Sequence, residues 1–374
     1  FKKNQFINAI VSYTQEDGSD LKDFLKVLFA SLDDKEKEGY PAYLAAFPYV
    51  NGQLFRDFTD IPDFNKEARN LLIDSSSKLD WSDINPDIFG SMFQAVVRPG
   101  ERTGLGQHYT SVPNIMKTIE PLFLNELKGE LDKFYDDARK LEQLLVRISN
   151  IKVFDPACGS GNFLIIAYKE MRRLEHAILE RQGELLGSTQ QILLGSRINI
   201  ENFYGIEIDD FAHEVAILSL WLAKHQMNLE FAEKFGTNLS LIPLKESGNI
   251  VHENAARIDW RQVCPNNGDE EIYLIGNPPY LGASLQDQSQ KADMAKACDD
   301  LPGYKKLDYI AIWFNKGSKY IGTSRAKLAF VSTNSICQGE QVSLLWGEVF
   351  NRDLEIDFAY TSFRWTNNAK IGRA

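Results

Sequence analysis

From residue 151 onward, short apolar runs alternate with segments of helical character. The runs read IKVFD, FYGIEID, IYLIGN, AKLAFVS and LEIDFAY, and each is closed by a polar residue or a glycine. Alternation of this kind predicts an α/β fold, a doubly wound, mostly parallel sheet with helices on both faces. Ligands of such folds bind outside the carboxyl ends of the strands, so the motifs that follow these runs are expected to share one site.

The first hundred residues are expected to form a small helical domain. In GSDLKDFLKVLFASL, apolar residues from Leu21 to Phe29 recur at helical spacing, and Ser19 or Asp20 can serve as the N-cap. The Gly-rich segment RPGERTGLGQHYTS separates this domain from a long helical stretch that begins NIMKTIEP. We therefore expect a helical connector over residues 1–105 and an α/β domain over residues 106–374.

Composition restricts the class of protein. No apolar run reaches the ~18 residues that a membrane-spanning helix needs. The four cysteines and five histidines are scattered, so we expect no disulfide scaffold and no metal site, and we expect a reducing cytoplasm. The formal net charge of −11 counts mildly against a nucleic-acid partner, because phosphate contacts usually need a basic face. A local basic cleft remains compatible with that charge.

The segment VFDPACGSGNFL combines an acidic strand end with a glycine turn. Its strand ends at Asp155, and a turn containing Gly159 and Gly161 leads into a helix. Glycines there let a ligand approach the backbone and leave amides free at the helix N-terminus. The acidic residue precedes the glycines, unlike in the dinucleotide fingerprint GxGxxG, and this order suits a cationic or amine-bearing ligand. A plain structural turn is the alternative.

A second strand, in FYGIEIDDFAHEVA, ends in Glu207. An acid at the end of the second strand of a nucleotide-binding sheet commonly binds ribose hydroxyls. Acids also cap helices, and Asp209 or Asp210 could cap the helix expected to start near Phe211. Capping fits those two residues better than it fits Glu207, which lies inside the strand.

A third strand runs into the turn IGNPPYLG. Proline donates no backbone hydrogen bond, so the strand must stop there. The Asn277 side-chain oxygen and the backbone carbonyl of Asn277 or Pro278 could each accept one hydrogen from a substrate amino group. This would withdraw the nitrogen lone pair from conjugation, while Tyr280 offers a face for stacking a flat base, at ~1–3 kcal/mol. A purely structural turn would rarely need both the amide and the aromatic ring.

Taken together, NPPY, DPACGSGNF and GIEID resemble the S-adenosylmethionine-dependent DNA adenine-N6 methyltransferases, in the gamma order of motifs. The succession QHYTS, DPACGSGNFL, FYGIEIDDFAHEVA, ARIDW and IGNPPYLG looks like the bacterial bifunctional type IIG/IIL restriction–modification enzymes. The resemblance implies a Rossmann-like fold, S-adenosyl-L-methionine as cofactor, no metal, and an adenine flipped out of double-stranded DNA as substrate. It further implies a nuclease and a target-recognition domain in the same chain. Neither is found here, so we expect a C-terminally truncated piece of a longer protein.

The resemblance also assigns residues to the cofactor. Tyr109 and Thr110 would contact its methionine part, and Glu207 would bind its ribose. Asn254, in HENAARIDW, would lie near its adenine ring, with Ile258 and Asp259 as alternatives. The residues expected to shape the rest of the pocket are Asp155, Ala157, Gly159 and Gly161.

For the target base, the resemblance implies that Asn277, Pro278 and Tyr280 hold the flipped adenine. A second aromatic residue would come from TSFRWTNNA, where either Phe363 or Trp365 could serve. One departure concerns the interval between the first two motifs, where EMRRLEHAILERQGELLGSTQQILLGS is expected to be an extra helical insertion.

Three other functions use similar chemistry. A protein glutamine-N5 methyltransferase could hold a side-chain amide at the same turn, although such enzymes are shorter and would not need GQHYTS. N4-cytosine methyltransferases usually carry Ser in place of Asn277. A DNA-bound regulatory module of a phage-defence system could bind the cofactor as a signal, but the intact NPPY favours turnover.

Overall fold

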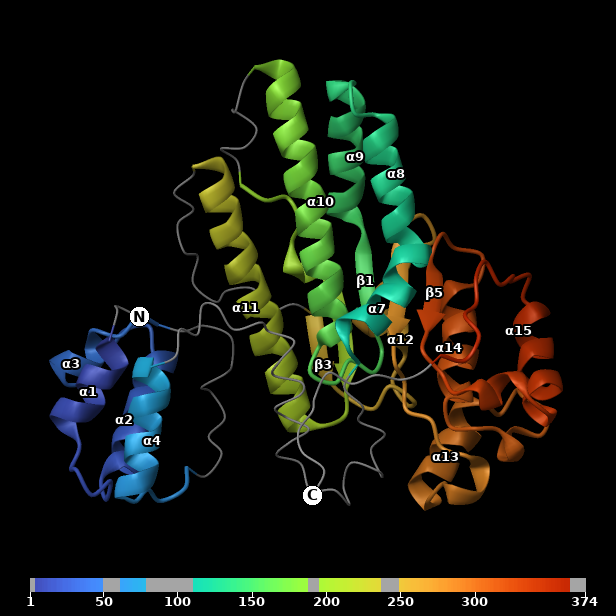
Figure 1. Cartoon of the computed structure of the whole chain (residues 1–374). Helices are drawn as coiled ribbons and strands as arrows, with labels where there is room; N and C mark the ends of the chain where they lie inside the picture. The colour runs from blue at the N-terminus through green and yellow to red at the C-terminus, as the bar shows by residue number, and fades with distance from the viewer. Residues whose placement is uncertain (1–3, 50–60, 79–109, 188–194, 237–248, 364–374) are drawn as a thin grey trace. The chain divides into compact units, whose positions relative to one another are not determined.

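The computed structural model describes five stretches of the chain, which Figure 1 draws as coloured ribbon. They are residues 4–49, 61–78, 110–187, 195–236 and 249–363. The chain divides into two compact units, one formed by Phe1–Asn85 with Ser240–Glu246 and the other by Pro86–Leu239 with Ser247–Ala374. The domain boundary expected between residues 105 and 106 lies outside the described residues.

The first unit is helical in its described part. Its helices are α1 (Gln5–Tyr13), α2 (Leu21–Asp33), α3 (Ala42–Ala45) and α4 (Lys66–Lys78). The helix expected from the apolar spacing after Asp20 is confirmed as α2, whose apolar face is buried in the core of this unit. The Asp20 side chain accepts a hydrogen bond from the Gln15 amide at 2.8 Å, which fixes the turn before the helix.

The second unit contains a five-stranded sheet in which every strand pair is parallel. The strand order is β3-β2-β1-β4-β5, so β1 is central and the chain winds outward from it in both directions. The expected α/β fold with a mostly parallel sheet is therefore confirmed. The strands are β1 (Lys152–Asp155), β2 (Phe203–Glu207), β3 (Asn249–His252), β4 (Ile272–Gly276) and β5 (Lys327–Phe330).

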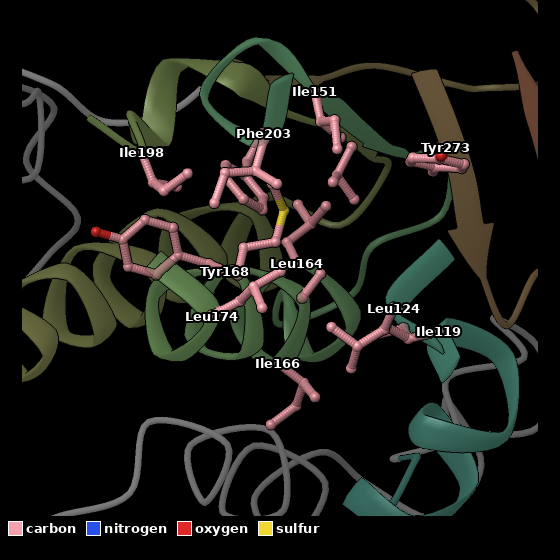
Figure 2. Packing of buried hydrophobic residues seen from close by; sticks show 14 of the residues in the cluster. Ile119, Leu124, Ile151, Leu164, Ile166, Tyr168, Leu174, Ile198, Phe203 and Tyr273 are labelled. Atoms are coloured by element: carbon pink, nitrogen blue, oxygen red, sulfur yellow. The ribbon is translucent and has the colours of Figure 1, made fainter. Parts of the chain in front are cut away.

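Helices cover both faces of this sheet because successive strand residues point to opposite sides. Val153 of β1 belongs to one buried cluster, and its neighbour Phe154 belongs to the other. Figure 2 shows part of the first cluster, where the ring of Tyr168 meets that of Phe203 edge-on at 5.3 Å. The helices on this face are α7 (Val112–Ile119), α8 (Asn125–Lys133), α9 (Ala138–Asn150), α10 (Asn162–Leu186) and α11 (Asp210–Phe235).

The opposite face is covered by the later helices of the chain. They are α12 (Trp260–Val263), α13 (Gln288–Ala297), α14 (Ala311–Ile321) and α15 (Gly347–Phe350). Trp260 of α12 is buried there and packs edge-on against the ring of Phe154 at 5.7 Å. The sheet is thus buried on both sides, which is why its strands are nearly continuous apolar runs.

The long helical stretch expected before the sheet is present, with two interruptions. A π-helical turn at Glu120–Leu124 joins α7 to α8. The helical structure is interrupted a second time between the end of α8 and the start of α9. Asp137 then begins α9, because its side chain accepts hydrogen bonds from the amides of Arg139 and Lys140 at 3.1 Å each. In Figure 1, α8, α9 and α10 run side by side.

Two expectations about strands were wrong. The run LEIDFAY, residues 354–360, forms no strand, and its Ile356 and Tyr360 are more than half exposed. Conversely, β3 was missed. It is a four-residue edge strand in which only Ile250 is buried, so its sequence carries little apolar signal.

The helical character expected for the insertion is confirmed as far as residue 186, and residues 188–194 of that segment lie outside the described residues. EMRRLEHAILERQGELL is the continuation of α10, a single helix of 25 residues that connects β1 to the segment before β2. The buried side chains Arg172 and Glu175 form an ion pair at 3.0 Å within it. Glu175 also accepts hydrogen bonds from the Ser196 hydroxyl and the Arg197 amide, so this part of the helix belongs to the core.

None of the helices in the described stretches is both long enough and apolar enough to cross a membrane. The four cysteines are free thiols; Cys158, Cys264 and Cys298 are buried and Cys337 is exposed.

Candidate active site

The strand order places the first and fourth strands side by side at the centre of the sheet. The chain winds to one side of β1 through β2 and β3, and to the other side through β4 and β5. Ligands of open α/β sheets bind at this switch point, beyond the carboxyl ends of the strands. Here those ends are Asp155 of β1 and Gly276 of β4.

Gly276 brings the two motifs into contact. Its φ is +152°, and a Cβ atom built on it would lie 2.5 Å from the Asp155 Oδ1 atom. No side chain fits in that space without displacing the carboxylate. The absence of a side chain at Gly276 thus lets the NPPY turn lie directly against the acid that ends β1.

Asp155 is almost fully buried, and only one of its oxygens has a partner. Oδ1 accepts the Ala157 amide hydrogen at 3.0 Å, whereas Oδ2 has no hydrogen-bond partner among the described residues. Burial raises the pKa of Asp155 to about 8, an effect that the Ala157 amide opposes and the nearby Glu207 carboxyl reinforces. A ligand that carries a positive charge would relieve this cost.

Glu207 ties the glycine turn to the second strand. Its Oε2 accepts the Gly159 amide hydrogen at 2.7 Å, and its Oε1 accepts the Asp209 amide hydrogen at 2.9 Å. Burial raises the pKa of Glu207, although these two amides act in the opposite direction. The Glu207 side chain therefore lies at the C-terminal ends of both β1 and β2. Asp209, by contrast, is the N-cap of α11, and its side chain accepts the Ala212 amide hydrogen at 2.7 Å.

The two glycines of the turn have different structural roles. Gly161 has a φ of +83°, and a Cβ atom there would lie 3.3 Å from the Cβ of Ala216, so it permits close packing of α10 against α11. Gly159 has a φ of +54° but open space around it. From the other face of the sheet, the Trp313 indole donates a hydrogen bond to the Pro156 carbonyl at 3.1 Å.

Asn254 follows the edge strand β3, at the same end of the sheet. Its Oδ1 accepts the Ala256 amide hydrogen at 2.8 Å, and its Nδ2 donates to Asp293 at 3.2 Å. Of the two alternatives for this position, Asp259 caps α12 by accepting the Arg261 amide hydrogen at 3.0 Å. Ile258 is half-buried in the core cluster of that face.

The segment around Asn254 is held by the buried Asp293 and the partly buried Lys316, which come from other helices. Asp293 of α13 accepts hydrogen bonds from Asn254, from the Arg257 guanidinium at 2.6 Å and from the Tyr309 hydroxyl at 3.0 Å. Lys316 of α14 donates to two backbone carbonyls of the same segment, at 2.6 Å each. Burial lowers the pKa of Lys316 to about 8.

The turn after β4 presents the Asn277 amide at the switch point. Its Nδ2 donates to the Thr110 hydroxyl oxygen at 3.2 Å. Its Oδ1 is buried and accepts no hydrogen bond from the described residues. A buried polar atom without a partner is costly in the absence of a ligand, so this oxygen marks a position where a donor belongs.

The following residues of the turn are fixed by the loop before α14. The Leu281 amide donates to the Asp308 carboxylate at 2.8 Å, and the Tyr309 amide donates to the Leu281 carbonyl at 3.0 Å. Tyr280, directly before Leu281, is half-buried, and burial, with a smaller contribution from Asp308, raises its pKa. Pro278 is buried.

The expected site residues thus fall into two groups. The structure brings together Thr110, Asp155, Glu207 and Asn277 through the contacts above, and Ala157, Gly159 and Gly161 line the turn between the first two acids. Phe363 is described, with the Lys117 ammonium 5.2 Å from its ring centre. Tyr109 and Trp365 lie outside the described residues, so the choice between Phe363 and Trp365 stays open.

Three contributing residues were missed from the sequence: Asp293, Asp308 and Lys316. They lie on or before helices that follow the motifs, and they act across 27 to 61 positions of sequence. Each is a charged side chain in a segment of ordinary helical or loop composition. A single sequence gives no sign of which such residues turn inward.

A parallel α/β sheet with acids at the ends of its first two strands and NPPY after β4 defines a methyltransferase-type domain. Residues 131–373 match the family described as MmeI, DNA-methyltransferase domain, and residues 1–55 match MmeI, helicase spacer domain. The chain belongs to this MmeI methyltransferase family, which confirms the resemblance carried by the motifs.

Individual relatives agree with this assignment. The chain is 52% identical over 375 residues to DNA methyltransferase A of Bacillus subtilis (strain 168), covering 100% of this chain and 42% of that protein. The structure of the type IIL restriction–modification enzyme MmeI in complex with DNA superposes with a TM-score of 0.89 at 42% identity. That match covers 99% of this chain and 50% of the MmeI chain.

A more distant relative is the adenine-specific methyltransferase BrxX of Escherichia coli O9:H4 (strain HS), 21% identical over 236 residues. It matches 55% of this chain and 19% of its own length. The chain therefore spans half or less of the length of each of these relatives.

Proposed function

We propose that this chain is the catalytic core of a site-specific DNA methyltransferase of a restriction–modification system. It transfers a methyl group from S-adenosyl-L-methionine to the exocyclic N6 of an adenine flipped out of double-stranded DNA. The observation that carries the proposal is the buried Asn277 Oδ1, an acceptor without a partner at the switch point of the sheet.

The residues at the ends of β1 and β2 fit this cofactor. The unpartnered Oδ2 of Asp155 is suited to an ammonium or sulfonium-bearing ligand, whose positive charge would offset the burial that raises the pKa of Asp155. Glu207 would accept ribose hydroxyls beside the Gly159 turn. Thr110 and Tyr109 would lie at the methionine end, and Asn254 near the adenine ring. When bound, the cofactor supplies an electrophilic methyl group on a positively charged sulfur.

The protein's own contribution is to orient the acceptor nitrogen. Asn277 Oδ1 and the Asn277 or Pro278 backbone carbonyl each accept one hydrogen of the adenine amino group. Both N–H bonds are then directed away from the lone pair, which leaves conjugation with the ring. Tyr280 stacks on the base, and the second stacking ring comes from Phe363 or Trp365.

Double-stranded DNA is the partner that this chemistry requires. The MmeI structure that resembles this chain over 99% of its length was solved in complex with DNA. We assign residues 1–105 to a helical connector and residues 106–374 to the methyltransferase domain, with nuclease and target-recognition parts belonging to the full-length protein. A cytoplasmic location follows from a DNA substrate.

The test is to express the full-length protein in a host that lacks adenine methylation and to quantify modified nucleosides in its DNA by mass spectrometry. N6-methyladenine should appear with the wild type and fall more than about 1,000-fold with Asn277→Ala, because a transition-state contact at the reacting nitrogen is lost. DNA without any methyl mark, despite sound expression, would overturn the proposal. Protein glutamine side chains would then be the substrate to test.

A further inference from the structure

We propose that Thr110 is a positioning residue that sets the orientation of the Asn277 amide; this rests on the function proposed above. The motif resemblance assigned Thr110 to the cofactor. In the structure its hydroxyl oxygen accepts a hydrogen bond from Asn277 Nδ2 at 3.2 Å, across 167 positions of sequence. Thr110 is 4% exposed, so this contact is shielded from solvent.

The orientation matters because the two ends of an amide are chemically opposite. The oxygen accepts hydrogen bonds, and the NH2 group only donates them. Rotation of the Asn277 side chain by half a turn would place an NH2 group against the amino group of adenine, donor against donor. Thr110 holds the NH2 end, which leaves Oδ1 unpartnered and available for the substrate.

Thr110 itself is held firmly. The backbone carbonyl of its neighbour Ser111 accepts hydrogen bonds from the amides of Asn114 and Ile115 at 2.9 and 3.0 Å, so the chain enters α7 directly after Thr110. Ile115 is fully buried in the core cluster of that face. The hydroxyl therefore occupies a position determined by the core and not by a surface loop.

A hydroxyl can accept and donate at the same time. While its oxygen accepts from Asn277, its hydrogen is available for a negatively charged acceptor such as the carboxylate of the cofactor. Once the Thr110 hydroxyl donates its hydrogen to that carboxylate, its oxygen can act toward Asn277 only as an acceptor. Cofactor binding would then favour the orientation of Asn277 that receives adenine.

The experiment uses the full-length protein and compares Thr110→Val, Thr110→Ala and Thr110→Ser. Valine keeps the shape and removes the acceptor, alanine removes both, and serine keeps the hydroxyl. Single-turnover methylation should fall about 10- to 100-fold for Val and Ala and stay within about threefold for Ser, as for loss of one buried hydrogen-bond partner. Thr118→Val, at a buried threonine of α7, the helix that follows Thr110, is the matched control and should retain the wild-type rate.

A binding readout separates positioning from a merely structural effect. Affinity is measured for DNA with adenine or with unsubstituted purine at the target position, with and without a non-reactive cofactor analogue. The cost of unpairing the base is the same for every variant, so a change in the adenine-to-purine ratio reports recognition of the amino group. The wild-type preference for adenine should increase with the analogue and shrink about fivefold or more in Thr110→Val, but not in Thr118→Val.

The outcomes are distinguishable. If the wild type neither methylates adenine nor prefers it over purine, the proposed function falls and this inference with it. If the wild type does both and the Val and Ala variants keep the full rate and ratio, only the role of Thr110 is overturned. A folded Val variant with a lower rate but an unchanged ratio also overturns it.

Discussion

The two ends of strand β1 differ in whether their charged side chains have partners. At the amino end, the Lys152 ammonium lies 2.6 Å from Glu270. The neighbouring Arg147 lies 2.7 Å from Glu271, at the start of β4. At the carboxyl end, Asp155 and Glu207 are buried, and within the described stretches no basic side chain forms an ion pair with either.

The consequences for ionisation run in opposite directions. Burial alone would raise the pKa of Glu271, but the hydrogen bonds from Arg147 and Tyr273 and the positive charge of Arg147 together outweigh it, and the pKa is lowered. Burial raises the pKa of Asp155 and of Glu207 with no cation to oppose it. The amino end therefore stabilises the fold, whereas the carboxyl end keeps an electrostatic cost that a ligand can offset.

The largest effect on stability is expected at the amino end. Arg147→Met removes the ion pairs to Glu126, Glu130 and Glu271 and leaves Glu271 partly buried without a cation. We expect a loss of about 2–3 kcal/mol in the free energy of unfolding, measured by urea denaturation, with cofactor affinity unchanged. Lys128→Met removes an exposed ammonium that lies 3.8 Å from Glu170, and it should cost less than about 0.5 kcal/mol. An equal loss of unfolding free energy in Arg147→Met and Lys128→Met would show that the ion pairs of Arg147 do not stabilise the fold more than an ordinary surface pair.

The next largest effect is expected at the C-terminal end of the strands, on cofactor affinity and less on stability. Glu207→Gln leaves one of the two backbone amides, Gly159 or Asp209, without an acceptor and removes the charge. We expect cofactor affinity, measured by calorimetry, to fall about 10- to 100-fold, with a smaller stability loss of about 1–2 kcal/mol. Glu201→Gln, the same change at an exposed position, is the control. Unchanged cofactor affinity in Glu207→Gln would remove Glu207 from the site.

The smallest effect is a change in how stability depends on pH. The folded-state pKa of Asp155 is raised to about 8, so between pH 4 and 8 the folded protein binds more protons than the unfolded chain. The stability contributed by this group is present below pH 4 and is lost as the pH rises through 8. Asp155→Asn should therefore flatten the decline, by about 1–2 kcal/mol across this range in the cofactor-free protein. A parallel decline in both proteins would show that Asp155 titrates normally.

Much of this site could be predicted from the sequence because its residues lie at strand ends within short motifs. Asp155, Glu207 and Asn277 each follow a buried apolar run, and parallel pairing then brings them to one edge. The contacts that orient them could not be predicted. Thr110 reaches Asn277 over 167 positions, and Asp293 turns inward from a helix of mixed composition.

The errors in the fold have related physical causes. The helical insertion was expected from the length of the interval between Asp155 and Glu207, and length alone does not show that Arg172 and Glu175 of α10 are buried as an ion pair. In β3, three of four residues remain at least partly exposed, because the strand lies at the sheet edge. LEIDFAY has the right alternation and its Asp357 lies 3.8 Å from Lys327 of the edge strand β5, yet it forms no strand. Local periodicity does not report whether a partner is present.

The missing side chain at Gly276 has a consequence for how such a protein can evolve. Only the backbone of Gly276 separates Asp155, at the end of β1, from the turn that presents Asn277. The space that a Cβ atom on Gly276 would need is taken by Asp155 Oδ1. Substitutions can therefore change the residues on either side of Gly276, but a larger residue at position 276 would displace the Asp155 carboxylate. If the function proposed above holds, this contact fixes the separation between the methyl donor and the acceptor through the backbone, independently of the side chains on either side.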